Sequence, residues 1–165
     1  TLSAIDNIFT EIFFILLTFL IIPYLNIYGK IITKEINMDC IFCKIVNNEA
    51  PSYTIFEDEI VKVFMNINPA SNGHLLIVPK KHYTNLVDIP LDTLNHINMI
   101  SKNMYTLLKE KLHVDGLTIS QNNDYGQEVK HFHMHLTPRY KGEKVDIVYN
   151  GDKLDVKEVF NILTR

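Results

Sequence analysis

Three histidines alternate with apolar residues in the C-terminal third of the chain, where Phe132 and Met134 separate His131, His133 and His135. If this stretch is a strand, all three imidazoles leave the backbone on one side, with neighbouring Cα atoms roughly 6–7 Å apart. A phosphate group fits within reach of two of them. Because imidazole is a nucleophile and a proton donor near neutral pH, the cluster predicts phosphoryl or nucleotidyl transfer, or a metal site. A partly exposed polar strand face is the alternative, and it explains a single histidine better than three in strict alternation.

The only two cysteines form a second candidate site, with the spacing Cys40-x-x-Cys43. This spacing leaves three interpretations open, namely a redox-active disulfide, two ligands of a zinc ion, or ordinary core residues. Two cysteines cannot complete a tetrahedral structural zinc site, but two histidines added to them could.

Hydrophobic periodicity predicts the elements that position these residues. In chain order they are a short helix with the cysteines at 40–48, a hairpin at 55–64, a buried strand at 75–78, a long amphipathic helix at 91–112, strands at 116–121 and 130–139, an extended segment at 145–149 and a closing helix at 155–163. Strands joined largely by short turns predict an α+β fold, in which one long helix packs on a five-stranded antiparallel sheet and the other helices are short.

The composition indicates one enzyme-sized domain rather than a nucleic-acid-binding protein. The chain has 165 residues, 47% of them hydrophobic, and a formal net charge of −3. This length supports a sizeable core. Duplex nucleic acid calls for a basic face, so we expect nucleotides, and no nucleic acid polymer, as ligands.

The first 37 residues differ from the rest, because the segment from Ile8 to Ile22 is almost wholly apolar. Its fifteen residues would span about 22 Å as a helix, less than the roughly 30 Å of a bilayer core. No Lys or Arg precedes it and no small-x-small cleavage site follows, which is unlike a secretory signal. Three interpretations stay open for residues 1–37: a targeting or membrane-anchoring leader, an apolar helix docked on the domain or a partner, or sequence upstream of a native start at Met38. The domain itself is expected at 38–165.

The motifs around the histidines resemble those of the histidine-triad (HIT) family of nucleotide-binding hydrolases and transferases. The family signature His-φ-His-φ-His-φ-φ, with φ apolar, reads His-Phe-His-Met-His-Leu-Thr over residues 131–137, and only Thr137 is weakly apolar. The resemblance runs from about Met38 to Tyr140 and is strongest to the small bacterial-type branch that includes protein-kinase-C-interacting-protein-like members. It implies the α+β fold described above and a homodimer in which two sheets join edge to edge.

The resemblance also implies catalytic roles for three histidines. His133 corresponds to the residue that attacks the α-phosphorus of a nucleotide and forms a covalent nucleotidyl-histidine, from which water releases the mononucleotide. In the family a backbone carbonyl holds the far nitrogen of that ring. His135 is expected to contact the α-phosphate or the leaving-group atom, stabilising charge and supplying a proton. His74 matches a fourth histidine directed at the same phosphate.

Further positions match the family's nucleotide site. These are Phe42, Phe64 and Ile67 at the base, Asn66 at the ribose, Asn122 or Asn123 at the sugar or phosphate, and Gln127, Glu128 and Val129 at the phosphates. By spacing alone the apolar members would be assigned to the core. Relatives usually carry an aspartate where Asn66 stands and often a serine where Glu128 stands. A carboxylate repels phosphate, so we expect Glu128 to contribute its backbone N–H and to point its side chain away.

In the zinc-bearing branch of the family, the ligands correspond to Cys40, Cys43, His82 and His131, so the resemblance implies a structural Zn²⁺ ion. Thiolates that hold zinc imply a reducing compartment and therefore a cytoplasmic protein, with an organelle or membrane contact through residues 1–37 as the alternative.

The expected activity is hydrolysis of purine nucleoside phosphoramidates or related adenylates, which releases AMP. Two alternatives stay open, namely hydrolysis of dinucleoside polyphosphates and a zinc-stabilised nucleotide-binding scaffold without turnover. Uridylyl transfer is disfavoured because that branch replaces the third histidine with glutamine.

Overall fold

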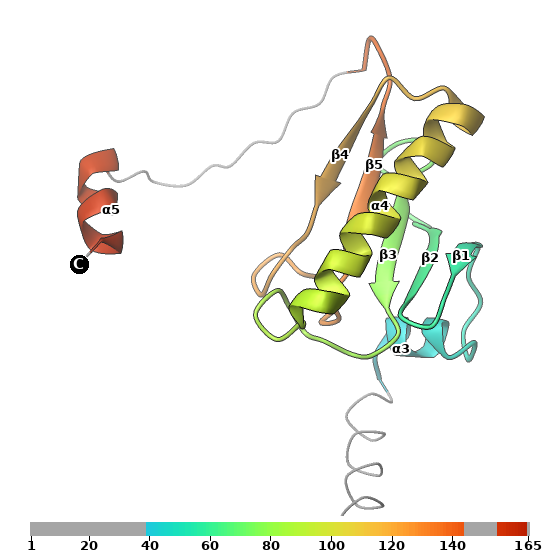
Figure 1. The fold of residues 1–165 in the computed structure, drawn as a ribbon, viewed down its shortest axis with the longest axis horizontal. Helices are drawn as coiled ribbons and strands as arrows, with labels where there is room; N and C mark the ends of the chain where they lie inside the picture. Colours follow the sequence, from blue (N-terminus) through green and yellow to red (C-terminus); the bar gives the residue numbers. More distant parts are fainter. Residues whose placement is uncertain (1–38, 144–154, 165) are drawn as a thin grey trace, which may run out of the picture.

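The computed structural model describes residues 39–143 and 155–164, so the expected leader at 1–37 and the extended segment at 145–149 lie outside the described residues. The described helices are α3 (Ile41–Val46), α4 (Leu91–Leu112) and α5 (Val156–Leu163). The strands are β1 (Thr54–Glu57), β2 (Val61–Met65), β3 (Leu75–Pro79), β4 (Gly116–Ser120) and β5 (Met134–Arg139). They form a five-stranded antiparallel sheet in the order β1-β2-β3-β5-β4, which confirms the predicted α+β fold (Figure 1).

The central strand is β3, whose continuous apolar run is buried along its whole length. It pairs with β2 through Phe64 and Leu76, and with β5 through Leu76 and His135. A strand that is buried on both faces needs apolar side chains at every position, which is the pattern the sequence carries.

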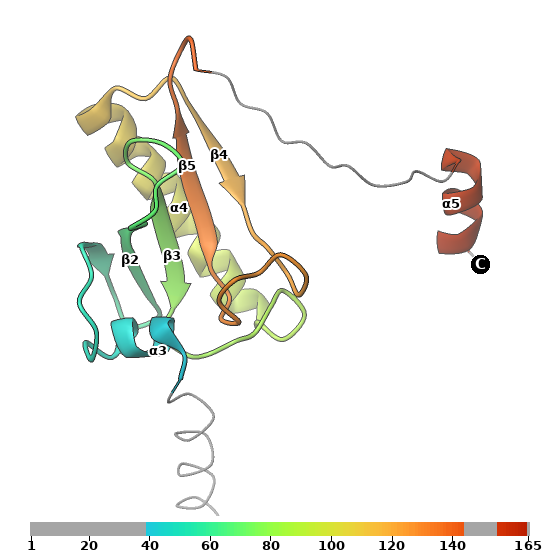
Figure 2. The same ribbon diagram turned by 180° about the vertical axis from the view of Figure 1, so that it is seen from behind.

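The sheet separates two apolar clusters. α4 runs across one face (Figure 1), and its Ile97 and Met104 belong to the larger cluster with Phe132, Met134 and Leu136. The helix α3 lies on the opposite side of the sheet (Figure 2), where the smaller cluster combines α3 residues with β2 and β3 residues. Because side chains alternate along an extended chain, the triad histidines face the α3 side.

The triad is not wholly within a strand, so the expected strand at 130–139 is too long. β5 begins only at Met134, after His131 and His133. The reason is that other partners take the polar groups of the preceding stretch: the Phe132 N–H donates to the Tyr83 carbonyl at 2.6 Å, and the His131 carbonyl accepts from the His133 ring. The histidines nevertheless keep to one side, because the stretch stays extended enough for Phe132 to enter the core.

The remaining helices agree with the sequence. α4 follows Pro90 and ends at Leu112, and the C-cap residue His113 has the left-handed φ of 53°. α5 begins after Asp155, whose carboxylate accepts from the N–H groups of Lys157 and Glu158 as a helix N-cap. Among the described helices, none combines the length and apolarity needed to cross a bilayer.

Gly73 immediately precedes the predicted catalytic residue His74 and requires glycine for two reasons. Its φ is +83°, and a Cβ there would lie 2.6 Å from Leu112 Cδ1 and 3.2 Å from Leu108 Cδ2. Gly126 offers a matched comparison, because its φ is +85° but a Cβ would meet nothing within 4 Å.

We expect Gly126→Ala to lower the free energy of unfolding by about 1–2 kcal/mol through backbone strain alone. Gly73→Ala should lower the free energy of unfolding by about 1 kcal/mol more, because the new methyl group would clash with Leu112. That half-exposed side chain can move aside only partly. Urea unfolding followed by circular dichroism measures both changes. Equal losses in the two variants would show that the contact with α4 carries no cost.

Candidate active site and metal centre

His133 is held so that one ring nitrogen is free to react. Its Nδ1 lies 2.7 Å from the backbone carbonyl oxygen of His131. A carbonyl can only accept, so Nδ1 carries the proton and Nε2 carries the lone pair. Burial lowers the pKa of His133, against the opposing effects of that carbonyl and of Glu128. The ring is therefore neutral near pH 7, in the tautomer whose outer nitrogen can act as a nucleophile.

The rings of His74 and His135 are hydrogen-bonded to each other, and their protons lie on Nε2 rather than on Nδ1 as in His133. The Ala70 N–H donates to His74 Nδ1 at 3.1 Å, so His74 carries its proton on Nε2. That Nε2–H points at His135 Nδ1, 3.0 Å away. His135 must then carry its own proton on Nε2, and this buried atom has no hydrogen-bond partner among the described residues.

Burial and the neighbouring His133 and His74 lower the pKa of His135 to about 4, and burial also lowers that of His74. Both rings are therefore neutral near pH 7. A buried donor without an acceptor costs about 1–3 kcal/mol, which an anionic oxygen bound at His135 Nε2 would offset. The rings of His133 and His135 lie 4.9 Å apart between centroids, so the ring with the free lone pair neighbours the ring with the unused N–H. This arrangement suits attack at a phosphorus whose oxygen accepts from His135.

The four predicted metal ligands come together in one cluster. The ligand atoms of Cys40, Cys43, His82 and His131 all lie within 4.8 Å of one another. His131 donates from Nε2 to the Pro79 carbonyl at 2.9 Å, which leaves its Nδ1 lone pair 3.5 Å from each sulfur. The Cys43 sulfur lies 3.2 Å from His82 Nδ1. Tetrahedral zinc, with bonds of about 2.3 Å to sulfur and about 2.0 Å to nitrogen, requires sulfur–nitrogen edges of about 3.5 Å. The cluster therefore fits a metal ion of this kind.

The protonation states of the cysteine and histidine side chains in this cluster are also compatible with binding of a cation. Both cysteines are free thiols. Burial raises the pKa of the Cys43 thiol to about 12, and the neighbouring Cys40 adds to the shift, whereas burial lowers the pKa of His131 to about 4. A cation bound between the sulfurs would favour the thiolates, and a neutral imidazole is already the form that ligates.

Gln127 was expected, with Glu128 and Val129, to offer groups that bind phosphate, above all the backbone N–H groups of the turn at Gly126. Its backbone N–H donates to the Asp124 carbonyl at 3.3 Å, and its side chain is buried in the protein. The amide N–H groups donate to the Thr84 carbonyl at 2.7 Å and to the His131 carbonyl at 3.4 Å, and its oxygen accepts from the Asp124 N–H at 3.3 Å. The buried amide thus ties the loop around Gly126 to the residue that orients His133.

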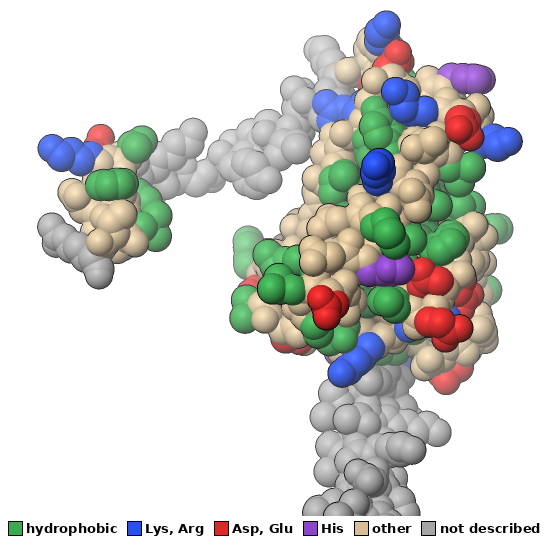
Figure 3. All heavy atoms as spheres, in the orientation of Figure 1, with side chains coloured by type: hydrophobic (Ala, Val, Ile, Leu, Met, Phe, Trp, Pro, Cys, Tyr) green, Lys and Arg blue, Asp and Glu red, His purple; other side chains and the backbone are tan. Residues whose placement is uncertain are grey.

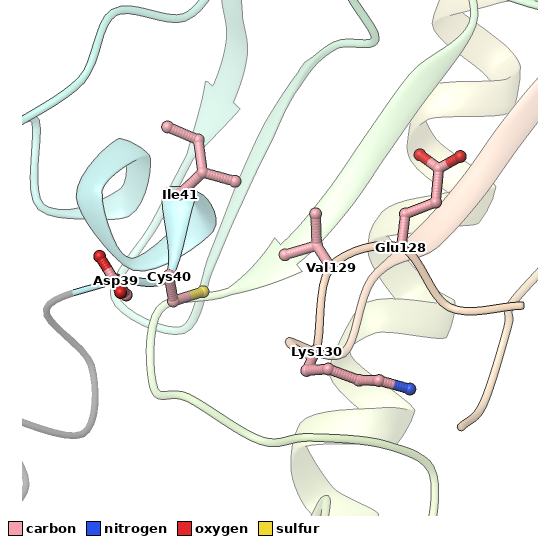
Figure 4. A pocket seen from close by; sticks show the side chains of 6 residues that line it. All are labelled: Asp39, Cys40, Ile41, Glu128, Val129 and Lys130. Carbon is pink, nitrogen blue, oxygen red and sulfur yellow. The ribbon is translucent and has the colours of Figure 1, made fainter. Parts of the chain in front are cut away.

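A hollow of about 340 Å³ opens beside the metal cluster, between the start of α3 and the segment that leads to the triad (Figure 4). It is lined by Asp39, Cys40, Ile41, Glu128, Val129 and Lys130. In Figure 4 the Lys130 side chain extends away from Cys40, and its ammonium donates to the Asp124 carbonyl. Sequence reasoning missed Asp39, Ile41 and Lys130 as lining residues, although Ile41 stands next to the predicted base contact Phe42.

Of the residues expected to contact a nucleoside, Phe42 and Phe64 lie together, whereas the Ile67 side chain is largely exposed. Phe42 packs edge-on against Phe64 at 5.7 Å and against His133 at 5.0 Å between ring centroids, and both phenyl rings are buried. Ile67 is 80% exposed. Asn66 accepts from the Asn68 N–H at 3.0 Å, and its amide nitrogen lies 3.4 Å from His74 Nδ1.

The two candidate asparagines differ in what their side chains already contact. The Asn123 side-chain oxygen accepts from the Leu86 N–H and from Gln121, and its amide donates back to Gln121. Asn122 is exposed, and no hydrogen bond from its side chain occurs within the described residues. Asn122 is thus the more available of the two for a ligand.

Comparison with known proteins agrees with this geometry. The sequence model of the HIT domain matches residues 47–142. An uncharacterised HIT-like protein of Methanocaldococcus jannaschii is 44% identical over 124 residues, which cover 73% of this chain and 95% of that protein. The adenosine 5'-monophosphoramidase HNT1 of Saccharomyces cerevisiae is 35% identical over 128 residues, covering 76% of this chain and 78% of that enzyme. The crystal structure of a zinc-bound histidine triad family protein from Mycobacterium smegmatis is similar with a TM-score of 0.64 and 34% identity, over 70% of this chain and 86% of that one.

Burial of His135 predicts a pH-dependent stability. Its pKa is about 4 in the folded chain, below the value of about 6.5 in an unfolded one, so between these values the unfolded state binds more protons. The stability that His135 contributes is therefore present above pH 6.5 and is lost as the pH falls toward 4. We expect urea midpoints to fall more between pH 7 and pH 5 in the unmodified protein than in His135→Gln.

His113→Gln is the matched control, because it removes an exposed histidine at the end of α4. That variant should keep the pH dependence of the unmodified protein. If His135→Gln keeps it as well, the buried pair does not cause the acid sensitivity.

Proposed function

Because this chain belongs to the histidine-triad (HIT) family, we propose that it hydrolyses purine nucleoside phosphoramidates and related adenylates at the α-phosphorus and releases AMP. The family includes nucleotide hydrolases, such as the yeast phosphoramidase described above. One observation carries the assignment to this chain: the ring of His133, with a free Nε2 lone pair, neighbours the ring of His135, with an unused Nε2–H.

The reaction has two balanced displacement steps. In the first, His133 Nε2 forms a bond to the α-phosphorus and the bond from phosphorus to the leaving nitrogen breaks. That nitrogen takes the electron pair and departs as a neutral amine, because the reactive form of the substrate already carries the proton there. His135 donates a hydrogen bond to a phosphoryl oxygen, and the His131 carbonyl stabilises the positive charge on the His133 ring.

In the second step, water attacks phosphorus, the bond to His133 breaks and one proton of the water passes to solvent. AMP leaves, and His133 regains its Nε2 lone pair. His74 keeps His135 in the donating tautomer in both steps, because the Ala70 N–H prevents His74 from protonating at Nδ1.

The charges around the site favour an amine over a polyphosphate as the leaving group. Glu128 lines the hollow with its carboxylate turned away from Cys40 and Lys130 (Figure 4), and no basic nitrogen of the described residues lies within 4.0 Å of that carboxylate. The Lys130 ammonium donates a hydrogen bond to the Asp124 carbonyl. Burial keeps the proposed catalytic histidines His133 and His135 neutral. A nucleoside polyphosphate would bring several negative charges to a place that offers, beside the Glu128 carboxylate, a single ammonium, that of Lys130, which already donates to the Asp124 carbonyl.

We also propose that Cys40, Cys43, His82 and His131 hold a structural Zn²⁺ ion. The spacing of the ligand atoms fits tetrahedral coordination, and the similar Mycobacterium smegmatis protein is described as zinc-bound. A zinc ion bound there would supply no step of the reaction, since four protein ligands would leave no open position. It would instead link α3 to the segments around His82 and His131.

The nucleoside is proposed to lie along the hollow. Ile41 and Val129 offer apolar surface there. Val129 packs against the cluster that contains Phe42 and Phe64, and Phe42 lies beside His133. Asn122 has its side chain available for the sugar or a phosphate. Ile67 and Asn66 remain predicted contacts of the base and the ribose, with Ile67 exposed and able to cover a bound ring.

A homodimer is proposed as the functional assembly, with two sheets joined through β4. This strand pairs only with β5 among the described strands, so its other edge is open, and Ile119 on it is half-exposed. Figure 3 shows hydrophobic side chains among charged ones over α4, where Leu91 and Met99 are exposed.

Because both ligand thiols must stay reduced, we further propose a cytoplasmic location.

Replacement of the nucleophile tests the proposed activity. We expect His133→Ala to lower AMP release from adenosine 5'-phosphoramidate by at least about a thousandfold, because no covalent intermediate can form. AMP binding, measured by calorimetry, should change only a few-fold. His113→Ala, at the exposed end of α4, is the control and should keep full activity. Equal rates in His133→Ala and the unmodified protein would refute the mechanism, and folded, zinc-loaded protein that binds AMP without turnover would indicate a binding module.

Replacement of Glu128 tests the charge argument. We expect Glu128→Gln to raise kcat/KM for a diadenosine polyphosphate about three- to tenfold at low salt, and to change it less than twofold for adenosine 5'-phosphoramidate. The gain should shrink at high salt, because screening weakens the repulsion in the unmodified protein. Glu143→Gln removes an exposed carboxylate beyond the far end of β5 and should change neither rate. Identical effects of the two substitutions would show that Glu128 does not select the leaving group.

A further inference from the structure

His131 takes part in two sites at once. Its ring presents Nδ1 to the two sulfurs of the metal cluster at 3.5 Å, and its backbone carbonyl accepts the Nδ1–H of His133 at 2.7 Å. The metal cluster and the nucleophile are therefore joined by a single residue, which is fully buried.

The contacts around His131 leave little freedom for its peptide group. The ring donates from Nε2 to the Pro79 carbonyl at 2.9 Å, and the backbone N–H donates to the Val129 carbonyl at 2.8 Å. The next residue, Phe132, donates its N–H to the Tyr83 carbonyl and fills the main core. With the ring fixed at both nitrogens, the direction of the carbonyl follows from where the ring sits.

A second route leads from the metal cluster to the same carbonyl. His82 lies two residues before Thr84, whose carbonyl accepts from the Gln127 amide at 2.7 Å. The same amide group lies 3.4 Å from the His131 carbonyl. Displacement of His82 would thus reach the carbonyl through Gln127 as well as through His131 itself.

We propose that a metal ion held by Cys40, Cys43, His82 and His131 sets the tautomer and direction of His133 through the His131 carbonyl, so that metal loading controls the nucleophile. This inference rests on the proposed function, because it concerns the residue that attacks phosphorus. Without a cation, the thiols hold the His82 and His131 rings only through weak S–H donors at 3.2–3.5 Å, so the ligand atoms can separate. When they separate, His131 turns and the bond to His133 Nδ1–H is lost.

Loss of the bond to the His131 carbonyl changes which nitrogen of the His133 ring carries the proton. A ring without that carbonyl exchanges between its two tautomers, and in the one with the proton on Nε2 no lone pair faces the substrate. We therefore expect metal removal to lower kcat/KM at least about tenfold. The affinity for AMP should fall less than threefold, since the apolar contacts of the base do not depend on the tautomer.

The test uses the full chain with ¹⁵N-labelled histidine, first loaded with Zn²⁺, then stripped by a chelator, then reloaded. The readouts are the His133 Nδ1–H resonance, identified by its absence in His133→Ala, together with kcat/KM and circular dichroism. The resonance should be sharp in the loaded protein, lost in the stripped protein and restored on reloading. A folded, stripped protein that keeps the resonance and its rate would overturn the inference.

Two variants separate this coupling from a general effect of losing a histidine. His82→Asn removes one ligand that does not touch His133, and should weaken both the resonance and kcat/KM in the presence of Zn²⁺. His96→Asn removes a histidine whose ring pairs with Asp58, and should leave the resonance, the rate and the zinc content unchanged. Equal behaviour of the two variants would count against the coupling.

If the stripped chain unfolds, the zinc form is compared with a Cd²⁺ form, whose metal–ligand bonds are longer. The coupling then requires a shifted His133 Nδ1–H resonance in the cadmium form, and identical resonances would overturn it. A loaded protein with an intact resonance but without AMP release would refute the proposed function alone, because the resonance does not depend on turnover.

Discussion

Backbone groups decide which nitrogen of each buried imidazole carries the proton, and the chemistry of the site depends on this choice. The Pro79 carbonyl assigns the proton of His131, the His131 carbonyl assigns that of His133, and the Ala70 N–H assigns that of His74. Burial keeps the rings neutral, so each ring carries one proton, and its position on Nδ1 or Nε2 determines what the ring can do. Neutral rings with fixed tautomers allow a single residue type to fill the three proposed roles of metal ligand, nucleophile and hydrogen-bond donor.

The strand β3 supplies both ends of this arrangement. His74 stands just before it and Pro79 is its last residue, so the donor pair and the metal cluster are fixed at opposite ends of the most deeply buried strand. β5 runs alongside and brings His135 opposite Leu76. A central strand that is packed on both faces has few ways to shift. The core of the fold thereby fixes the separation between the proposed nucleophile, the proposed donor and the proposed metal ligands.

Sequence reasoning identified the features that are written in side-chain types. The alternating histidines, the Cys-x-x-Cys and the apolar run of β3 need particular residues, and the five-stranded sheet followed from them. The orienting groups at Ala70 and Pro79 were not predictable, because every residue carries the same carbonyl and nearly every one the same N–H. The inward turn of Gln127 and the late start of β5 were missed for a related reason, since both depend on contacts with the loop after β3. Lys62, which is buried with its ammonium near Glu57 and the Ile45 carbonyl, likewise shows no sign of burial in the sequence.

The six-residue length of α3 has a consequence for the stability of the proposed nucleotide site. Fewer than two turns of helix are unstable in water on their own, so α3 exists only because of what it packs against and what its cysteines hold. The same helix carries Ile41 and Phe42, which stand at the hollow and beside the nucleophile. A helix that depends on its surroundings for stability is therefore also one wall of the proposed binding site. Loss of packing or of metal ligation at α3 would therefore alter this wall of the proposed binding site before it altered the sheet.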